Sequence, residues 1–340
     1  MGGNILKILV VFTGGTIGSS VTDGYISTDI NKKYQLIDMY HKKYGNESDD
    51  IIFEHFEPYT ILSENLTGEY ISILQTCIKE KIKEEKYDGI IITHGTDSLV
   101  YMAAAMGYAI GNGSIPIMFV SSNYVLDDAR ANGLDNFSYA VKFIKEKNGK
   151  GVFVSYKNTD NITYIHRATR VMMQLPCSDN IHSVAESYFG MYVNNIFQMN
   201  RKYREINDET NILEPLSGRK CSDVVRIVQM PGIKYRIDLE EVKAVLLDSY
   251  HSGTVCFEND YYTQVLREIM KKNIPIFLTG VNMDTDYESV KELYKYGINT
   301  LPVTSPVAMY MKLWMLCEMN MDIEKYMHKS LAGDIVERKI

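Results

Sequence analysis

Two short loops carry residue types and spacings that could do chemistry. The first, TGGTIG at residues 13–18, and the second, THGTDS at residues 93–98, each follow an apolar run directly. Paired glycines let backbone N–H groups approach a ligand closely, and the threonines add hydroxyl groups. A hydroxyl beside a carboxylate, as in Thr96 and Asp97, suits an enzyme that holds an amino group and positions a proton transfer. Together the loops form a specific pair.

Each loop on its own also has an ordinary structural interpretation. The first could be a tight turn between a strand and a helix. Its glycines, Gly14, Gly15 and Gly18, lack the GxGxxG spacing of dinucleotide sites, and it has no P-loop lysine. In the second, Thr96 or Asp97 could cap a helix that begins near Ser98.

The elements around these loops alternate between strand and helix patterns. Continuous apolar, β-branched runs predict buried strands at residues 7–12, 89–93, 115–120 and 151–156. Helical spacing predicts helices at residues 66–86 and 98–110. This rhythm is typical of parallel βαβ units. Ligands bind beyond the carboxyl ends of such strands, which is where both loops lie.

A second α/β region follows a stretch of charged and turn residues at 199–222, which we interpret as a linker. Beyond it the pattern predicts strands at residues 224–229, 243–248 and 274–279, and helices at residues 261–272, 288–296 and 306–319. We therefore expect an α/β fold. A larger N-terminal domain (residues 1–198) would hold a flavodoxin-like parallel sheet, and a smaller C-terminal α/β domain would span residues 223–340.

Composition excludes several classes of protein. Of the 340 residues, 45% are hydrophobic and 23% charged, as in a globular chain with a sizeable core. The net charge of −7 gives no basic surface for nucleic acid. No apolar run approaches the roughly 18 residues of a membrane span. The first apolar stretch lacks a cleavage site, so we expect a buried strand and no signal peptide.

The cysteines and histidines are dispersed. The five cysteines are odd in number and have no metal-type spacing, which predicts a reducing, cytoplasmic location: Cys77, Cys177, Cys221, Cys256 and Cys317. No HxH or HExxH pattern occurs, so we expect chemistry without a metal.

In combination, TGGTI at residues 13–17 and THGTDS at residues 93–98 resemble the bacterial-type L-asparaginase (asparaginase/glutaminase) family. The resemblance covers nearly the whole chain, including DGYIS after the first loop and KAVLLDSYHSG near residue 248, and is closer to the intracellular type I branch. It implies an amidohydrolase that converts asparagine, and often glutamine, to the acid and ammonia. It also implies a homodimer or homotetramer and no cofactor.

The resemblance gives roles to individual residues. Thr16 corresponds to the nucleophile, which needs a partner to take its proton. Tyr25, in a polar stretch suited to a mobile lid, corresponds to the lid tyrosine beside it. Thr96 corresponds to the second catalytic threonine, and Asp97 to the carboxylate that binds the substrate α-ammonium group. Gly15 would be among the residues that contact substrate.

Ser63 corresponds to the residue that meets the substrate α-carboxylate, and Glu64 beside it departs from the family pattern. A second carboxylate there repels the substrate carboxylate unless it turns toward the ammonium group. Glu64 therefore either tunes specificity or points to solvent. The resemblance implies that backbone N–H groups of the two loops, Thr16 and Thr96 included, hold the oxyanion.

A further departure concerns the catalytic lysine of the family, whose position is taken by Arg170 in HRATR. Arginine stays protonated, so it could hold Thr96 and Asp97 but could not act as a base. Three interpretations stay open. Another lysine such as Lys157 enters the site, Arg170 acts as a fixed charge beside Thr16 and Tyr25, or the protein binds an amino acid without hydrolysing it.

The sequence is also compatible with two other functions, and it bears on how subunits assemble. The amidase subunit of a tRNA-dependent amidotransferase shares the motifs, but the first motif begins at residue 13, where we expect no room for an added N-terminal domain. A non-catalytic amino-acid sensor is the rival outside enzymes. The apolar helix expected at residues 306–319 either serves a subunit interface or is core, and Tyr250 and His251 are candidates for contacts between subunits.

Overall fold

The structure is a computed structural model of the protein. It describes residues 5–15, 17, 19–22, 25–28, 34–84, 86–204, 213–281, 287–288 and 290–337. For residues 19–22 and 25–28 it describes the backbone path alone.

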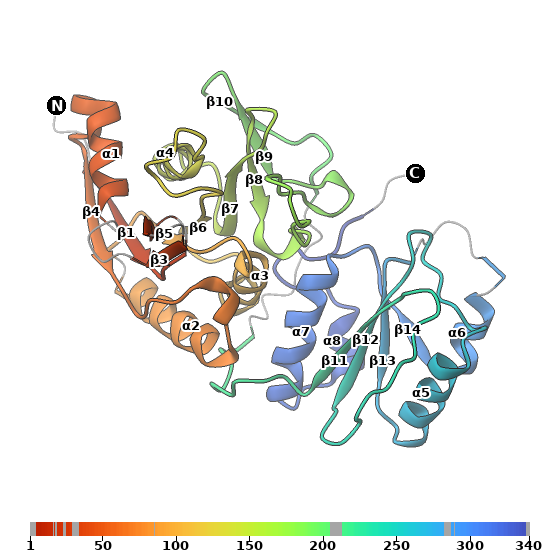
Figure 1. Ribbon diagram of the computed structural model, residues 1–340. Helices are drawn as coiled ribbons and strands as arrows, with labels where there is room; N and C mark the ends of the chain where they lie inside the picture. Colours follow the sequence, from red (N-terminus) through yellow and green to blue (C-terminus); the bar gives the residue numbers. More distant parts are fainter. Residues whose placement is uncertain are drawn as a thin grey trace.

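The larger sheet has eight strands in the order β10-β9-β8-β7-β6-β5-β1-β4 (Figure 1). These strands are β1 (Leu6–Phe12), β4 (Ile51–Phe56), β5 (Gly89–Thr93), β6 (Pro116–Val120), β7 (Gly151–Lys157), β8 (Thr163–Arg167), β9 (Gly190–Val193) and β10 (Ile196–Met199). The five from β4 to β7 are mutually parallel, and β8, β9 and β10 extend the sheet in antiparallel fashion. Numbered along the sequence, the parallel strands have the order 2-1-3-4-5 of flavodoxin-like sheets, as predicted.

Helices cover both faces of this sheet, which explains why its central strands are apolar throughout. Alternate residues of β1 point to opposite sides. Leu9 and Val11 pack with helices α2 (Gly68–Lys83) and α3 (Leu99–Ile110), whereas Ile8 and Val10 pack with α1 (Gln35–Tyr44) and α4 (Gly133–Lys145).

The smaller sheet is fully parallel, in the order β11-β12-β13-β14. Its strands and helices are β11 (Val224–Val228), β12 (Ala244–Asp248), β13 (Ile276–Thr279), β14 (Ile298–Thr300), α5 (Asp260–Lys271), α6 (Val290–Lys295), α7 (Pro306–Glu318) and α8 (Ile323–Met327). Helix α7 lies between the two sheets and packs against α3 (Figure 1). Its apolar side chains, Met311 and Trp314 among them, are buried within the protein itself, so the core interpretation is confirmed.

Short elements complete the described fold. They are the antiparallel hairpin β2 (Ser19–Thr22) and β3 (Tyr25–Thr28), and the 3-10 turns at Gly45–Ser48, Ser63–Asn65, Ala168–Arg170 and Val184–Glu186. The predicted strands and helices are confirmed to within a few residues. The strands β2, β3, β4, β8, β9, β10 and β14 and the helices α1 and α8 were not predicted. In the described part of the protein, no helix has both the length and the apolar character to cross a membrane.

The C-terminal segment at residues 329–336, which we call the tail clasp, returns to the larger sheet. Its Asp334 pairs with Lys312 of α7 at 2.8 Å, and both side chains are fully buried. Asp334 also accepts hydrogen bonds from the hydroxyl of Tyr108 on α3, at 3.0 Å, and from the N–H of Leu331, at 2.9 Å. The tail clasp therefore joins α3 to α7 through a buried charge pair.

Candidate active site

The two motif loops lie at the switch point of the larger sheet. Strand β1 pairs with β4 on one side and with β5 on the other, so the connections leave in opposite directions at the edge between β1 and β5. A crevice forms at such a point, beyond the carboxyl ends of the strands. The first loop follows β1 and the second follows β5, so strand order alone brings them together.

The loops touch through their glycines. A Cβ atom added to Gly15 would collide with the backbone of Gly95, and Gly15 has a φ of +80° that disfavours side chains. The hydroxyl of Thr13 donates to the carbonyl of Thr93 at 2.7 Å, which ties one loop to the other. Glycine is required at position 15 because the two backbones nearly meet there, and a Cβ atom added to Gly95 would collide with the Ser63 side chain.

A third segment completes the crevice. After β4 the backbone runs beside the first loop, where Ile61 accepts from Gly15 N–H at 3.2 Å and donates to Thr13 carbonyl at 3.1 Å. This course delivers Ser63 to the crevice. Its hydroxyl donates to Asp97 Oδ2 at 3.3 Å, and the hydroxyl of Ser98 donates to the Ser63 carbonyl at 2.5 Å. Ser63 is buried, whereas Asp97 and Glu64 are exposed, so the Asp97 carboxylate is oriented yet open to a cation.

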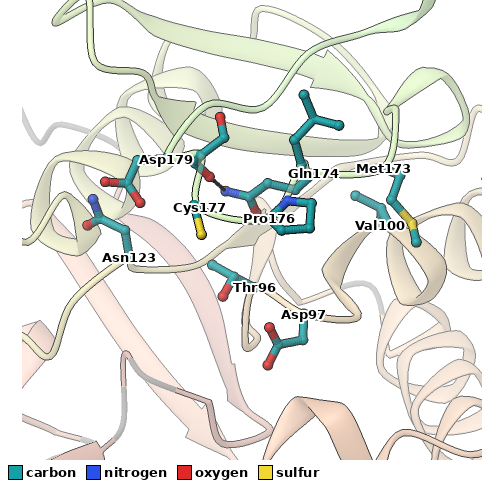
Figure 2. Close-up of a pocket in the computed structure, with 11 residues that line it drawn as sticks. Thr96, Asp97, Val100, Asn123, Met173, Gln174, Pro176, Cys177 and Asp179 are labelled. Atoms are coloured by element: carbon teal, nitrogen blue, oxygen red, sulfur yellow. Dashed lines mark hydrogen bonds between the residues drawn. The ribbon is translucent and has the colours of Figure 1, made fainter.

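A cavity of about 360 Å³ opens over Thr96 and Asp97. In Figure 2 the segment at residues 173–179 lies across from Thr96 and Asp97, and the Asp97 carboxylate points away from that segment. That segment supplies the opposite wall, with Gln174, Cys177 and Asp179 among its polar groups, and Gln174 donates to the Ser178 carbonyl at 2.8 Å. Sequence reasoning did not assign this wall to the site.

The structure brings five of the predicted site residues together: Gly15, Ser63, Glu64, Thr96 and Asp97. The predicted nucleophile Thr16 lies outside the described residues. Tyr25 is the first residue of β3, and its side chain is outside the described part. The roles of Thr16 and Tyr25 therefore stay predictions.

Arg170 does not join this group. Its fully buried guanidinium donates to three backbone carbonyls, of Gly333 at 2.5 Å, Arg204 at 2.7 Å and Ile335 at 3.3 Å. It also lies 4.4 Å from the centre of the Tyr203 ring. The expected contact of Arg170 with Thr96 and Asp97 is replaced by contacts with the tail clasp and the end of the larger sheet.

Lys157, the other residue considered for the lysine position, lies elsewhere as well. Its ammonium group pairs with Asp135 of α4 at 2.8 Å, and Lys43 pairs with the same carboxylate at 2.9 Å. Among the described residues that line the cavity over Thr96, none is a lysine.

His94 lies buried beneath the second loop. Its Nδ1–H donates to the Gly95 carbonyl at 2.9 Å, and its backbone N–H donates to the Val120 carbonyl at 2.9 Å. Burial lowers the pKa of His94 to about 4, and the hydrogen bond to Gly95 opposes this shift only in part. His94 is therefore neutral at pH 7 and supports the loop that carries Thr96 and Asp97.

The lowered pKa of His94 predicts a dependence of stability on pH. The unfolded histidine titrates near 6.5, so the stability that the neutral form contributes is present above that pH and is lost as the pH falls toward 4. Between pH 7 and pH 5.5 the loss is about 1 kcal/mol. We expect the free-energy difference between wild type and His94→Gln, from denaturant unfolding, to shrink by that amount. A difference that is unchanged between the two pH values would contradict a neutral His94.

Comparison with known proteins agrees with this geometry. A family model described as "Asparaginase, N-terminal" matches residues 7–203. The D subunit of the glutamyl-tRNA(Gln) amidotransferase from Methanobrevibacter smithii is 29% identical, over 98% of this protein and 77% of its own length. An L-asparaginase from Thermococcus kodakarensis is 24% identical, over 97% of this protein and 99% of its own length.

Solved structures show the same fold. The thermostable L-asparaginase from Thermococcus kodakarensis has a TM-score of 0.76 at 22% identity, covering 98% of this protein and 100% of its own length. L-asparaginase I from Vibrio cholerae has a TM-score of 0.74 at 19% identity, covering 98% of this protein and 99% of its own length. At these identities the likeness concerns the fold alone.

Proposed function

We propose that this protein, which belongs to the asparaginase family, is an amidohydrolase that converts L-asparagine to L-aspartate and ammonia. The observation that carries the proposal is the meeting of the two motif loops at the switch point, with Asp97 oriented by Ser63 beside a cavity. A zwitterionic amino acid needs an anion for its ammonium group and hydroxyl or N–H donors for its carboxylate, and this crevice offers both.

Binding would fix the substrate by its α-carbon groups. The Asp97 carboxylate would pair with the ammonium group, and the Ser63 hydroxyl would turn from Asp97 to the α-carboxylate. The amide of the substrate side chain would then lie toward the end of β1, near Gly15. Charge-assisted hydrogen bonds of this kind are the strongest that a small site can provide.

The chemical step would use hydroxyl groups. The Thr16 oxygen would attack the amide carbon, its proton would pass to the amide nitrogen, and the C–N bond would break to release ammonia. Water would then cleave the resulting ester to give aspartate and restore Thr16. Tyr25 would close over Thr16, and Thr96 would serve the proton transfers. Arg170 has no part in this scheme, because its guanidinium is engaged by the tail clasp.

The test is ammonia release from L-asparagine, with L-glutamine and D-asparagine in parallel, for wild type and Asp97→Asn. Wild type should release ammonia from L-asparagine. Asp97→Asn should raise KM for L-asparagine by about 10- to 100-fold, because a neutral amide replaces the partner of the ammonium group.

Glu69→Gln is the matched control, since Glu69 is an exposed carboxylate in the first turn of α2 and does not line the cavity over Thr96 and Asp97. An unchanged KM in Asp97→Asn would remove Asp97 from the binding site. Binding of asparagine without turnover, seen as a raised melting temperature, would favour the amino-acid sensor.

A second candidate is suggested by the glutamyl-tRNA(Gln) amidotransferase among the relatives. In that case the protein would act as an amidase subunit beside a partner and tRNA. Its net charge of −7 gives it little attraction for tRNA on its own. Ammonia release that requires added tRNA and a second subunit would favour this candidate.

Location and assembly belong to the proposal too. All five cysteines are free thiols, which suits a reducing cytoplasm. We propose a homodimer or homotetramer, with Tyr250 and His251 of the smaller sheet near the contact. We also propose that residues 199–222 link two domains, one at residues 1–198 and the other at residues 223–340.

A further inference from the structure

A second cavity, of about 620 Å³, adjoins the site on the other side of Asp97. Asp97 lines both cavities, and Ser63 and Glu64 line the second one. We call this second space the adjoining cavity. Its volume is in the range of small-molecule sites. A group attached to a substrate held at Asp97 and Ser63 would therefore find room there.

Three aromatic side chains form part of the wall of the adjoining cavity, beside polar and charged residues. Tyr101 projects from α3, and Tyr310 and Trp314 project from α7. The ring centres of Tyr101 and Tyr310 lie 6.3 Å apart at 90°, and those of Tyr310 and Trp314 lie 6.0 Å apart. Such walls favour an apolar or aromatic group over a hydrated one.

Two cationic side chains also line the adjoining cavity, Lys220 just before β11 and Arg226 within it. Arg226 is bound to Asp248 at 2.6 Å, so its charge is balanced. Lys220 is exposed, and within the described part of the protein its ammonium group has no ion-pair partner. A carboxylate that reached through the cavity would meet Lys220.

The position of Glu64 affects which substrates the adjoining cavity favours. Glu64 directly follows Ser63, the residue proposed to hold the α-carboxylate, and both line the adjoining cavity. A free carboxylate there is repelled by Glu64, whereas a neutral peptide group is not. The arrangement therefore favours a substrate whose α-carboxyl is already joined to another residue.

We propose that the site hydrolyses the side-chain amide of asparagine when asparagine is the N-terminal residue of a dipeptide with an apolar or aromatic second residue. This inference rests on the proposed function. The ammonium group binds Asp97, the second side chain packs among the aromatic walls, and the C-terminal carboxylate faces Lys220. As for free asparagine, attack by Thr16 breaks the C–N bond of the asparagine amide and releases ammonia, and water then cleaves the ester to give an aspartyl dipeptide and restore Thr16.

The experiment compares asparaginyl-phenylalanine with free L-asparagine as sources of ammonia, with mass spectrometry of the dipeptide product. Wild type should act on the dipeptide with kcat/KM at least equal to that for asparagine. Lys220→Met should lower kcat/KM for the dipeptide about 3- to 10-fold and leave that for asparagine unchanged. Lys291→Met, an exposed lysine of α6, is the matched control and should change neither.

A second measurement does not depend on any variant. The C-terminally amidated dipeptide lacks the carboxylate, so wild type should act on it about 3- to 10-fold less well than on the acid. Activity on asparagine with none on the dipeptide would overturn this inference and leave the proposed function standing. Activity on neither compound would overturn both, and equal losses in Lys220→Met for both substrates would remove Lys220 from a specific role.

Discussion

Replacing Thr16 with alanine is expected to reduce kcat for ammonia release from L-asparagine by at least about 10³-fold, because the acyl-enzyme cannot form without the hydroxyl. Thr16 directly follows Gly15, whose backbone contacts the second loop beside Ser63 and Asp97. The proposed role of Thr16 as nucleophile rests on this position in the sequence, next to a residue that lies at the crevice. Steady-state ammonia release under saturating asparagine is the measurement.

Controls for this prediction separate chemistry from folding. Thr16→Ser keeps a hydroxyl and should retain far more activity than Thr16→Ala. Thr16→Ala should still bind aspartate, seen as a melting temperature that rises with ligand concentration. If Thr16→Ala kept wild-type turnover, the nucleophile would have to be another hydroxyl, and Thr96 would be the next to test. Turnover abolished in Thr96→Ala alone would then reassign the role.

The meeting of the two loops was predictable from the sequence. Apolar runs before Thr13 and before Thr93 indicated buried parallel strands, and the carboxyl ends of parallel strands share one edge. Adjacency of β1 and β5 then needs only the flavodoxin-like order, which the structure has. Gly15 could be identified as a site glycine for the same reason, since its motif lies at the end of a strand.

The position of Arg170 away from the cavity could not be predicted, because most of its hydrogen-bond partners are remote in the sequence. Local spacing aligned it with a catalytic lysine, but of its three backbone hydrogen bonds described above two are to residues 333 and 335, more than 160 positions away. A motif comparison reads neighbours along the sequence and cannot register such contacts. The adjoining cavity could not be predicted for the same reason, because its lining residues are far apart in the sequence. Tyr101 comes from α3, Lys220 from the segment before β11, and Trp314 from α7.

The largest effect on stability is expected at the tail clasp. Lys312 and Asp334 form an ion pair at 2.8 Å with no exposed surface on either side chain. Removing one partner leaves a buried charge without compensation, which costs about 3–5 kcal/mol. Lys312→Met and Asp334→Asn should each lower the denaturant midpoint accordingly. The exposed pair Lys202 and Glu186, at 3.2 Å, is the matched control, and its loss should cost less than about 1 kcal/mol.

The stability of the double variant shows whether charge or packing at Lys312 and Asp334 causes the loss. Asp334→Asn preserves an acceptor oxygen for the N–H of Leu331, and Lys312→Met with Asp334→Asn removes both charges together with the hydrogen bond from Lys312 to the Lys329 carbonyl. If uncompensated charge is the cause, the double variant should be more stable than either single variant, and the coupling energy should reach about 1–3 kcal/mol. Additive losses would mean instead that packing of each side chain sets the stability. Because Tyr108 also binds Asp334, and lies on the helix that begins just after Asp97, a loosened clasp would further show as a higher KM for asparagine.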